Sequence, residues 1–129
     1  MIDQDLLSFL QALNTPAGGK VFLETVDDSI PRPLIVIRRA GGSHPRSLGG
    51  RALFPRSQFE INILAGEHAT AYPIATQIVT ALHGYRGLLG ATRIHDARCV
   101  LFPDHSSEVD GDHVTRFVTT QFQFMHSEG

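Results

Sequence analysis

The stretch that most constrains the fold is residues 57–84, in which the spacing of apolar residues changes. Apolar side chains first alternate with polar ones, which predicts a half-buried β-strand because successive side chains leave opposite faces of a sheet. Phe59, Ile61 and Ile63 form one face of this strand, and Gln58, Glu60 and Asn62 form the other. Beyond Gly66 the apolar residues recur at helical spacing instead, at Ala71, Ile74, Ala75, Ile78 and Leu82.

The ends of this helix are predicted from residue types that commonly begin or end helices. Thr70 is the expected N-cap, which places Pro73 in the first turn, where a missing backbone N–H costs little. Gly84 occupies the position at which a left-handed residue ends many helices. We therefore expect the helix to lie across the apolar face of the sheet that contains the strand.

The other segments predict a helix at the start of the chain, followed by four more strands. The expected elements are a helix over residues 2–13, strands over 20–26, 34–37, 92–102 and 114–125, irregular segments over 27–33, 40–55, 85–90 and 103–113, and a frayed tail over 126–129. Within the irregular segment before the last strand, Asp110-Gly111 is a hairpin signal. Residues 34–37 are apolar on both faces, which predicts a central strand covered by helices on one side and by the N-terminal helix or a neighbouring subunit on the other.

The resulting fold class is α+β. We expect a mixed or antiparallel sheet of about four to five strands, with the central helix packed on one face and an N-terminal helix besides. The element order is α-β-β-(long loop)-β-α-β-β. A chain of 129 residues predicts one domain over residues 1–129 with a single core.

Bulk properties argue against several functional classes. The net charge of -2 does not favour a dedicated nucleic-acid binder, and no apolar run approaches the roughly 20 residues that span a bilayer. The first residues lack the basic region of a signal peptide. The single cysteine, Cys99, cannot form an internal disulfide, which fits a reducing cytoplasm.

Arginines gather around the longest irregular segment. Ten of the 11 basic residues are arginine, and five of them lie within residues 38–56. Arginine is favoured where planar contacts to a partner are made, although a genome rich in G and C would give the same bias, and a solvated hairpin tip is the plain structural alternative. The expected contact residues with a subunit or partner are Arg46, Arg51, Leu53, Phe54 and Arg56. Changing Leu53 and Phe54 to polar residues is expected to weaken self-association.

Candidate reactive groups do not form a recognisable site in the sequence. The seven histidines include no His-x-His and no His-Glu-x-x-His pair, and the acidic residues of 104–112 lack the order of a calcium loop. Cys99 lies in an apolar stretch typical of a buried thiol, and neighbours such as His95 and Asp96 point to opposite faces of a strand. No catalytic, metal-binding or cofactor-binding residue is expected. A metal-binding or hydrolytic protein would have to gather scattered histidines: His68, His83, His95, His105 and His113.

The order of elements and several short motifs resemble a known family. The motifs are residues 81–87 (Ala-Leu-His-Gly-Tyr-Arg-Gly), Ile94, the acidic segment 104–112, the closing strand at 114–118 and the proline-led strand at 30–36. Together they resemble the small tail-completion and tail-terminator proteins of siphophages and prophages. The motifs mark turns and strands, so they name no reactive group, and the segment 41–55 is longer and more basic than is usual in that family.

The resemblance implies a structural role in assembly. In that family the subunits form a ring, thought of as a hexamer, at the head-proximal end of the tail tube, where it terminates tube growth and joins the tail to the head. The implied partners are other copies of the chain, the tail tube protein and the head–tail connector proteins, with passage of DNA through the lumen. The implied location is the virion tail, and the host cytoplasm during assembly. A neck or head-closure component of the same apparatus is the alternative.

Overall fold

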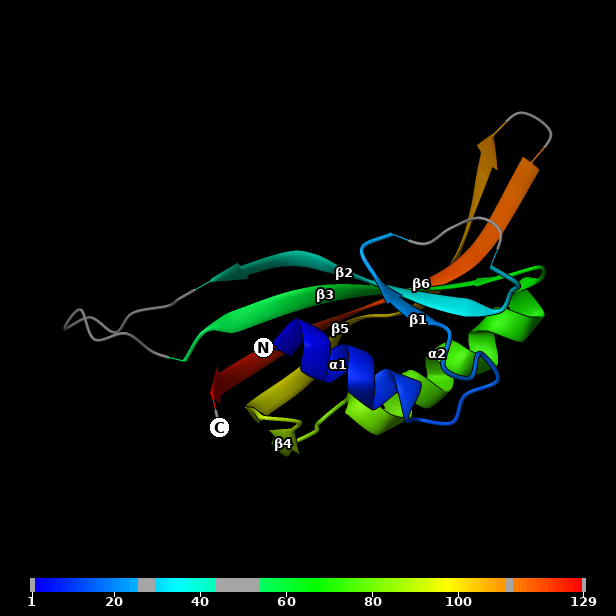
Figure 1. Ribbon diagram of the computed structural model, residues 1–129. Coiled ribbons are helices and arrows are strands. Elements are labelled where there is room, and N and C mark those ends of the chain that lie inside the picture. Colours follow the sequence, from blue (N-terminus) through cyan, green and yellow to red (C-terminus); the bar gives the residue numbers. More distant parts are fainter. Residues whose placement is uncertain (1, 26–29, 44–53, 111–112, 129) are drawn as a thin grey trace.

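The computed structural model describes residues 2–25, 30–43, 54–110 and 113–128 of the chain. In this part of the chain two helices cover one face of a curled six-stranded sheet (Figure 1). The α+β prediction is therefore confirmed, with more strands than expected. The elements are α1 (Ile2–Gln11), β1 (Val21–Leu23), β2 (Leu34–Ser43), β3 (Arg56–Ala65), α2 (His68–Leu82), β4 (Gly87–Leu89), β5 (Thr92–Asp110) and β6 (His113–Glu128).

The strands lie in the order β1-β2-β3-β6-β5-β4, and only β1 runs parallel to its neighbour. α2 packs against β3, β5 and β6, whereas α1 packs against β1 and β4. One register line across the sheet centre joins Ile37, Ile61 and Thr120. This line lies on the face that meets the helices, because all three side chains are fully buried.

The core confirms the alternation predicted for β3. Phe59, Ile61 and Ile63 are buried against the helices, together with the predicted apolar stripe of α2. In α1, Ile2, Leu6 and Leu10 are buried at helical spacing, also as predicted. Full burial of one such side chain contributes on the order of 1.5–3 kcal/mol, so this shared core is the main source of the fold's stability.

The start of β2 is buried on both faces, as its sequence predicts. Ile35 and Ile37 belong to the core under the helices, while Leu34 and Val36 are 1% and 4% exposed. Leu34 and Val36 are thus covered within one chain. A neighbouring subunit is not required to cover this strand.

The predicted start of the central helix is wrong by three residues. α2 begins at His68 after an N-cap at Glu67, and the N–H groups of Thr70 and Ala71 both donate to the Glu67 carbonyl. The first turn therefore forms before Thr70, and Pro73 lies inside the helix rather than in its first turn. The predicted left-handed residue after the helix is confirmed, because Gly84 has φ +79°.

The turn expected at residues 85–90 is in part a strand. Gly87–Leu89 forms β4, which pairs with Thr92–Ile94 of β5 as a short hairpin, and Gly90 with φ +59° lies in its turn. Three residues are too few for an alternation pattern to be recognised in the sequence.

Several strands are longer than expected. β5 continues through the segment predicted as irregular, to Asp110, and β6 continues through the predicted frayed tail, to Glu128. β2 extends to Ser43, so residues 40–43 are strand and not loop. Strand β1 is shorter than the predicted 20–26. The hairpin signalled by Asp110-Gly111 is confirmed, because Asp110 pairs with His113.

The end of the β5–β6 pair projects beyond the rest of the sheet (Figure 1). β3 pairs with β6 only as far as Arg116, so the strand residues beyond this point form a two-stranded ribbon. Such a ribbon has solvent near both faces, so it does not need the apolar alternation of a half-buried strand. The added residues 40–43 of β2, by contrast, pair with β3 beside β6, and the two glycines among them leave no alternation to recognise.

Candidate interaction surfaces

The structure describes two of the five predicted contact residues, Phe54 and Arg56, at the start of β3. Arg46, Arg51 and Leu53 lie outside the described residues. Phe54 is 47% exposed, and its ring stacks on that of His95 with centroids 4.0 Å apart and planes at 15°. Arg56, the first residue of β3, is exposed. Phe54 is therefore partly held by its own chain, while a large share of its ring remains open to a partner.

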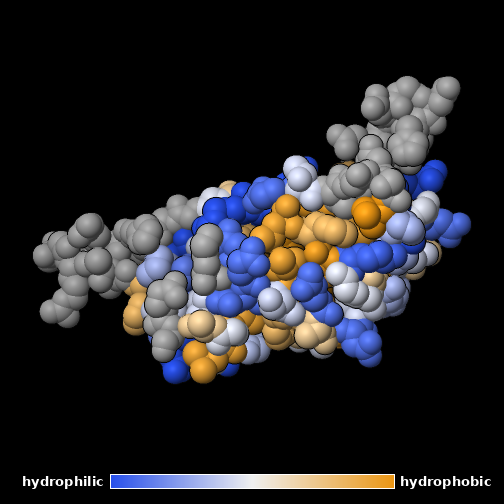
Figure 2. Space-filling view, viewed as in Figure 1, coloured by the Kyte–Doolittle hydropathy of each residue, from blue (hydrophilic) through white to orange (hydrophobic). Residues whose placement is uncertain are grey.

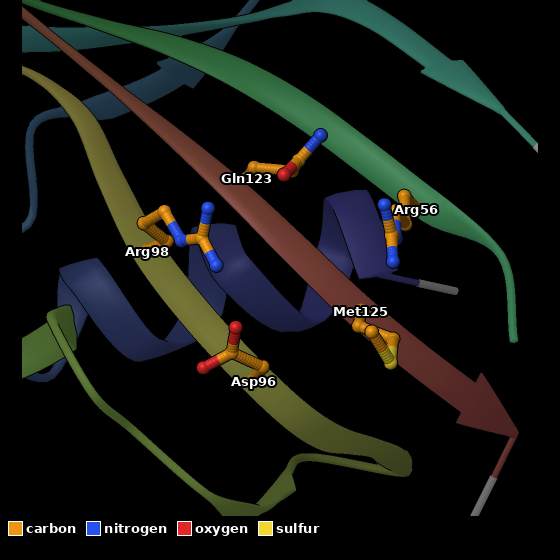
Figure 3. Close-up of a pocket in the computed structure, with 5 residues that line it drawn as sticks. All are labelled: Arg56, Asp96, Arg98, Gln123 and Met125. Carbon is orange, nitrogen blue, oxygen red and sulfur yellow. The ribbon is translucent and has the colours of Figure 1, made fainter.

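Arg56 also borders a shallow depression on the sheet face opposite the helices (Figure 3). The other lining residues are Asp96, Arg98, Gln123 and Met125, from β5 and β6. Its volume of about 60 Å³ would hold only a few water molecules. Sites for small organic ligands are typically several hundred Å³, so this depression does not form a substrate pocket.

The helix-free face of the sheet carries polar side chains that form hydrogen bonds with one another. The Gln58 amide donates to Gln121 Oε1 at 3.0 Å, and the Asn62 amide donates to Glu60 Oε1 at 2.8 Å. The Thr119 hydroxyl donates to Asn62 Oδ1. These pairs satisfy the polar groups along the middle strands, so the face is a pre-formed polar surface on β3 and β6.

Arg39 has a structural role that the sequence did not predict. Its guanidinium donates to Asp3 Oδ1 at 2.7 Å and to Ser57 Oγ at 3.1 Å, and lies 5.0 Å from the centre of the Phe59 ring. These contacts join the first turn of α1 to β2 and β3. Arg39 was not among the predicted contact residues, and although it is exposed, as Arg38 is, its guanidinium is bound within the fold.

A serine and a histidine lie within hydrogen-bond distance at the same end of the sheet. Ser57 Oγ is 2.8 Å from His126 Nε2, and Ser57 is only 4% exposed. Because Ser57 Oγ already accepts a hydrogen bond from Arg39, its own proton is available to His126. A serine nucleophile must reach its substrate, and this burial fits a link between strands instead.

Two of the histidines named for a metal site, His83 and His95, are engaged in separate contacts, and the side chains of His105 and His113 lie outside the described part of the structure. His83 Nδ1 accepts a hydrogen bond from the Cys99 backbone at 3.1 Å, and His95 Nε2 lies 2.8 Å from Ser127 Oγ. Within the described residues, no group of three or more His, Cys, Asp or Glu is arranged to hold a metal ion. Cys99 is buried, as its apolar surroundings predict.

Asp5 binds the turn that follows β4. Thr92 Oγ1 donates to Asp5 Oδ2 at 2.5 Å. This hydrogen bond is the main reason why the pKa of Asp5 lies below its ordinary value of 3.8, although partial burial acts in the opposite direction. The carboxylate thus fixes α1 to the β4–β5 hairpin.

Strand β5 has an edge that its described neighbours leave open. β4 pairs with this edge only at Thr92–Ile94. Further along β5, the residues after α2 cover the edge: the Gly84 N–H donates to the Ala97 carbonyl, and the Cys99 N–H donates to His83 Nδ1. From residue 100 onward, no strand among the described residues pairs with this edge. Two exposed apolar side chains lie where the open edge begins, Val100 at 43% and Phe102 at 61% exposed.

Strand β2 has a comparable open edge at the other end of the sheet. β1 pairs with β2 only as far as Ile37, and the Arg39 N–H donates to the Glu24 carboxylate at 3.1 Å. Over residues 40–43 the described chain places β3 on one side of β2 and no strand on the other. The sheet thus has two open stretches of edge, which lie on opposite sides of the sheet.

The helix side of the molecule has a mixed surface. Figure 2 shows apolar surface over β1 and the neighbouring part of β2, beside mostly polar surface over the helices. Phe22 and Leu23 of β1 are half-buried. No helix within the described part of the chain has the length and apolar character needed to cross a membrane.

The sequence matches no protein-family model and no curated protein. Its fold, by contrast, is similar to 11 chains of solved structures. One of these belongs to a structure described as the virion of a native gene transfer agent particle. The similarity has a TM-score of 0.66 at 19% identity and covers 99% of this chain and 92% of that chain. At this level of identity the likeness establishes a shared fold over nearly the whole chain.

Proposed function

We propose that the protein is a structural component of a phage-like particle. The observation that carries this proposal is the match of 99% of the chain to a chain of a gene transfer agent virion. The motifs that resemble tail-completion proteins give independent support, since they fall at the end of α2, in β5 and in β6 of the same fold. The role we infer is binding to other particle proteins, without catalysis.

The specific role we infer is that of a tail terminator. In this proposal, copies of the chain form a ring, of about six subunits, on the head-proximal end of the tail tube. The ring stops tube growth and presents a surface to the head–tail connector, with DNA passing through its lumen. The protein would be made in the host cytoplasm and end in the virion tail. A neck or head-closure station is the alternative within the same apparatus.

The contact residues of the ring remain those at the end of the β2–β3 hairpin. Phe54 and Arg56 are exposed there, and Arg46, Arg51 and Leu53 belong to the same hairpin in sequence. Aromatic and arginine side chains are the usual anchors of protein interfaces. The open strand edges add a second source of contact, because unpaired edge groups readily pair with another chain.

Tube-length measurement tests the proposal. Purified tail tube protein from the same genetic unit would be polymerised alone and with this protein, and tube lengths and ends compared by electron microscopy. We expect shorter tubes, each with a ring at one end. Unchanged tubes without bound protein would contradict the terminator role, and binding to isolated head connectors alone would favour the neck station.

The Phe54→Ser variant provides the first mutational check of the contact residues. The ring of Phe54 is half exposed, so its loss should weaken ring formation while the fold keeps most of its stability. Tyr72→Ser on α2, where 42% of the residue is exposed, is the matched control. Equal assembly of the Phe54 variant and the parent would remove Phe54 from the interface.

A further inference from the structure

The two open strand edges of the sheet differ in a way that makes them complementary. On β2 the open stretch, residues 40–43, consists of alanine, two glycines and serine. On β5 the open stretch from residue 100 onward begins with Val100 and Phe102, which are large and exposed. Small residues on one strand allow the close backbone approach of another strand that carries bulky side chains.

The charges at the two ends are also opposite. Residues 38–56 contain five arginines and no acidic residue, whereas residues 100–116 contain four acidic residues and one arginine, Arg116. Among the described side chains, Arg38, Arg39 and Arg56 are exposed at the first end, and Asp104 and Arg116 are exposed at the second, where Arg116 donates to the Gly66 carbonyl. Opposite potentials on two surfaces favour their association and disfavour the pairing of either surface with itself.

The positions of these ends exclude their pairing within one molecule. β3 and β6 lie between β2 and β5 in the sheet, so the two open edges face away from each other. An edge of β2 can therefore meet an edge of β5 only if the second edge belongs to another copy. Such an interface joins two different surfaces, and its repetition produces a closed ring when the rotation between successive copies closes on itself.

We propose that copies of this chain assemble head to tail, with the open edge of β2 at the arginine-bearing end of one copy paired to the open edge of β5, at Phe102 and Asp104, of the next. This proposal rests on the proposed function and names the subunit contact of the ring. The pairing extends the sheet from one copy to the next by main-chain hydrogen bonds, with Phe102 as an apolar anchor. The charged ends set the direction of assembly.

Two variants separate the two halves of this interface. Arg38→Glu with Arg56→Glu reverses the charge at the β2 end, and Phe102→Asp with Asp104→Arg removes the anchor and reverses the charge at the β5 end. All four side chains are exposed, so both variants should fold like the parent, as circular dichroism would show. The matched control is Leu88→Asp with Arg93→Glu, which changes an exposed apolar residue and an exposed arginine at the β4–β5 hairpin.

Sedimentation at low ionic strength measures the result. We expect the parent and the control to form rings. Each interface variant alone should associate at least roughly tenfold more weakly than the parent. An equal mixture of the two variants should form heterodimers through the one intact pair of surfaces. Higher salt should weaken the association of the parent, because the attraction is between exposed charges.

Three results would overturn the proposal. The first is that each variant alone forms rings as well as the parent. The second is a mixture of the two variants that stays monomeric under conditions in which the parent assembles. The third is a parent that stays monomeric at every concentration tested. None of these results affects tube termination, so the proposed function would still be decided by the measurement of tube length.

Discussion

Arg39 links three elements of the fold, α1, β2 and β3. It reaches Asp3 of α1, Ser57 of β3 and the face of Phe59, and Ser57 continues the connection to His126 of β6. The bond to Asp3 is partly exposed and contributes little by itself. The bond to buried Ser57 and the contact with Phe59 each contribute roughly 0.5–1.5 kcal/mol.

Replacing Arg39 with alanine should therefore destabilise the protein by about 1–2 kcal/mol. Urea unfolding of the parent and variant measures this difference. Arg38→Ala is the matched control, since Arg38 is exposed and has a longer bond of 3.3 Å to the Glu24 carbonyl; it should cost less than about 0.5 kcal/mol. Equal losses in the two variants would contradict the linking role of Arg39.

Asp5 makes the stability of the folded protein depend on pH. Its folded-state pKa lies below the ordinary 3.8, mainly because of the hydrogen bond from Thr92. A carboxyl with a lowered folded-state pKa contributes stability above its unfolded pKa, and this contribution is lost as the pH falls through the folded-state pKa. The contribution of Asp5 should therefore be complete at neutral pH and decline below about pH 4.

The Asp5→Asn variant tests this pH dependence. At pH 7 it should be less stable than the parent by about 1 kcal/mol, because a hydrogen bond to a charged acceptor is stronger than one to a neutral amide. The difference should shrink as the pH falls below about 4. In a Thr92→Val background the same change should have little effect at pH 7. A difference that is constant over this pH range would contradict the assignment.

At the scale of elements, the β4–β5 turn depends on a glycine. Gly90 has φ +59°, and a Cβ at this position would collide with Asp5 Oδ1 and lie 2.8 Å from Asp5 Cγ. Gly90→Ala should cost about 1–3 kcal/mol, since the left-handed conformation alone costs roughly 1–2 kcal/mol.

A double-mutant cycle separates the two causes of that cost. In an Asp5→Ala background the collision is absent, so Gly90→Ala should cost less than it does in the parent. Gly66→Ala is the control, because a Cβ there meets nothing within 4 Å; it should change the stability by less than about 0.5 kcal/mol. Thermal unfolding gives all four differences. A Gly90 variant as stable as the Gly66 variant would be inconsistent with this reading.

Elements that contribute one regular face to the core could be predicted from the sequence. β3 and the buried stripe of α2 follow simple periods, and every apolar position predicted for them is buried. The start of α2 was misjudged because Thr70 is a good capping residue by type, whereas the backbone carbonyl of Glu67 accepts the first bonds. The capping preference of the threonine side chain does not predict at which residue the first turn of the helix forms.

The contacts that join elements could not be predicted from the sequence. Arg39 and Asp3 are far apart in the chain, and nothing in the spacing of either residue distinguishes a link within the fold from an exposed charge. The same holds for Asp5 with Thr92 and for Ser57 with His126. For Phe54, one of the predicted contact residues, the structure adds its stack on His95, which nothing in the sequence indicates.

At the scale of the whole molecule, the main feature is that its two ends differ in charge. The sheet has a core under two helices, and its two open edges, on β2 and β5, lie on opposite sides of it. One end is rich in arginine and the other in acidic residues. A molecule with two different ends is suited to head-to-tail assembly, in which each copy uses one end to bind its predecessor and the other to bind its successor.

The measurement that tests the central claim most directly is the mass of the parent protein in solution over a wide range of concentrations, by light scattering after size exclusion, with negative-stain images of the largest species. The account predicts a concentration-dependent shift to closed rings of about six subunits. A stable two-fold dimer at all concentrations would contradict it, because such a pair uses the same surface on both copies and leaves no route to a ring.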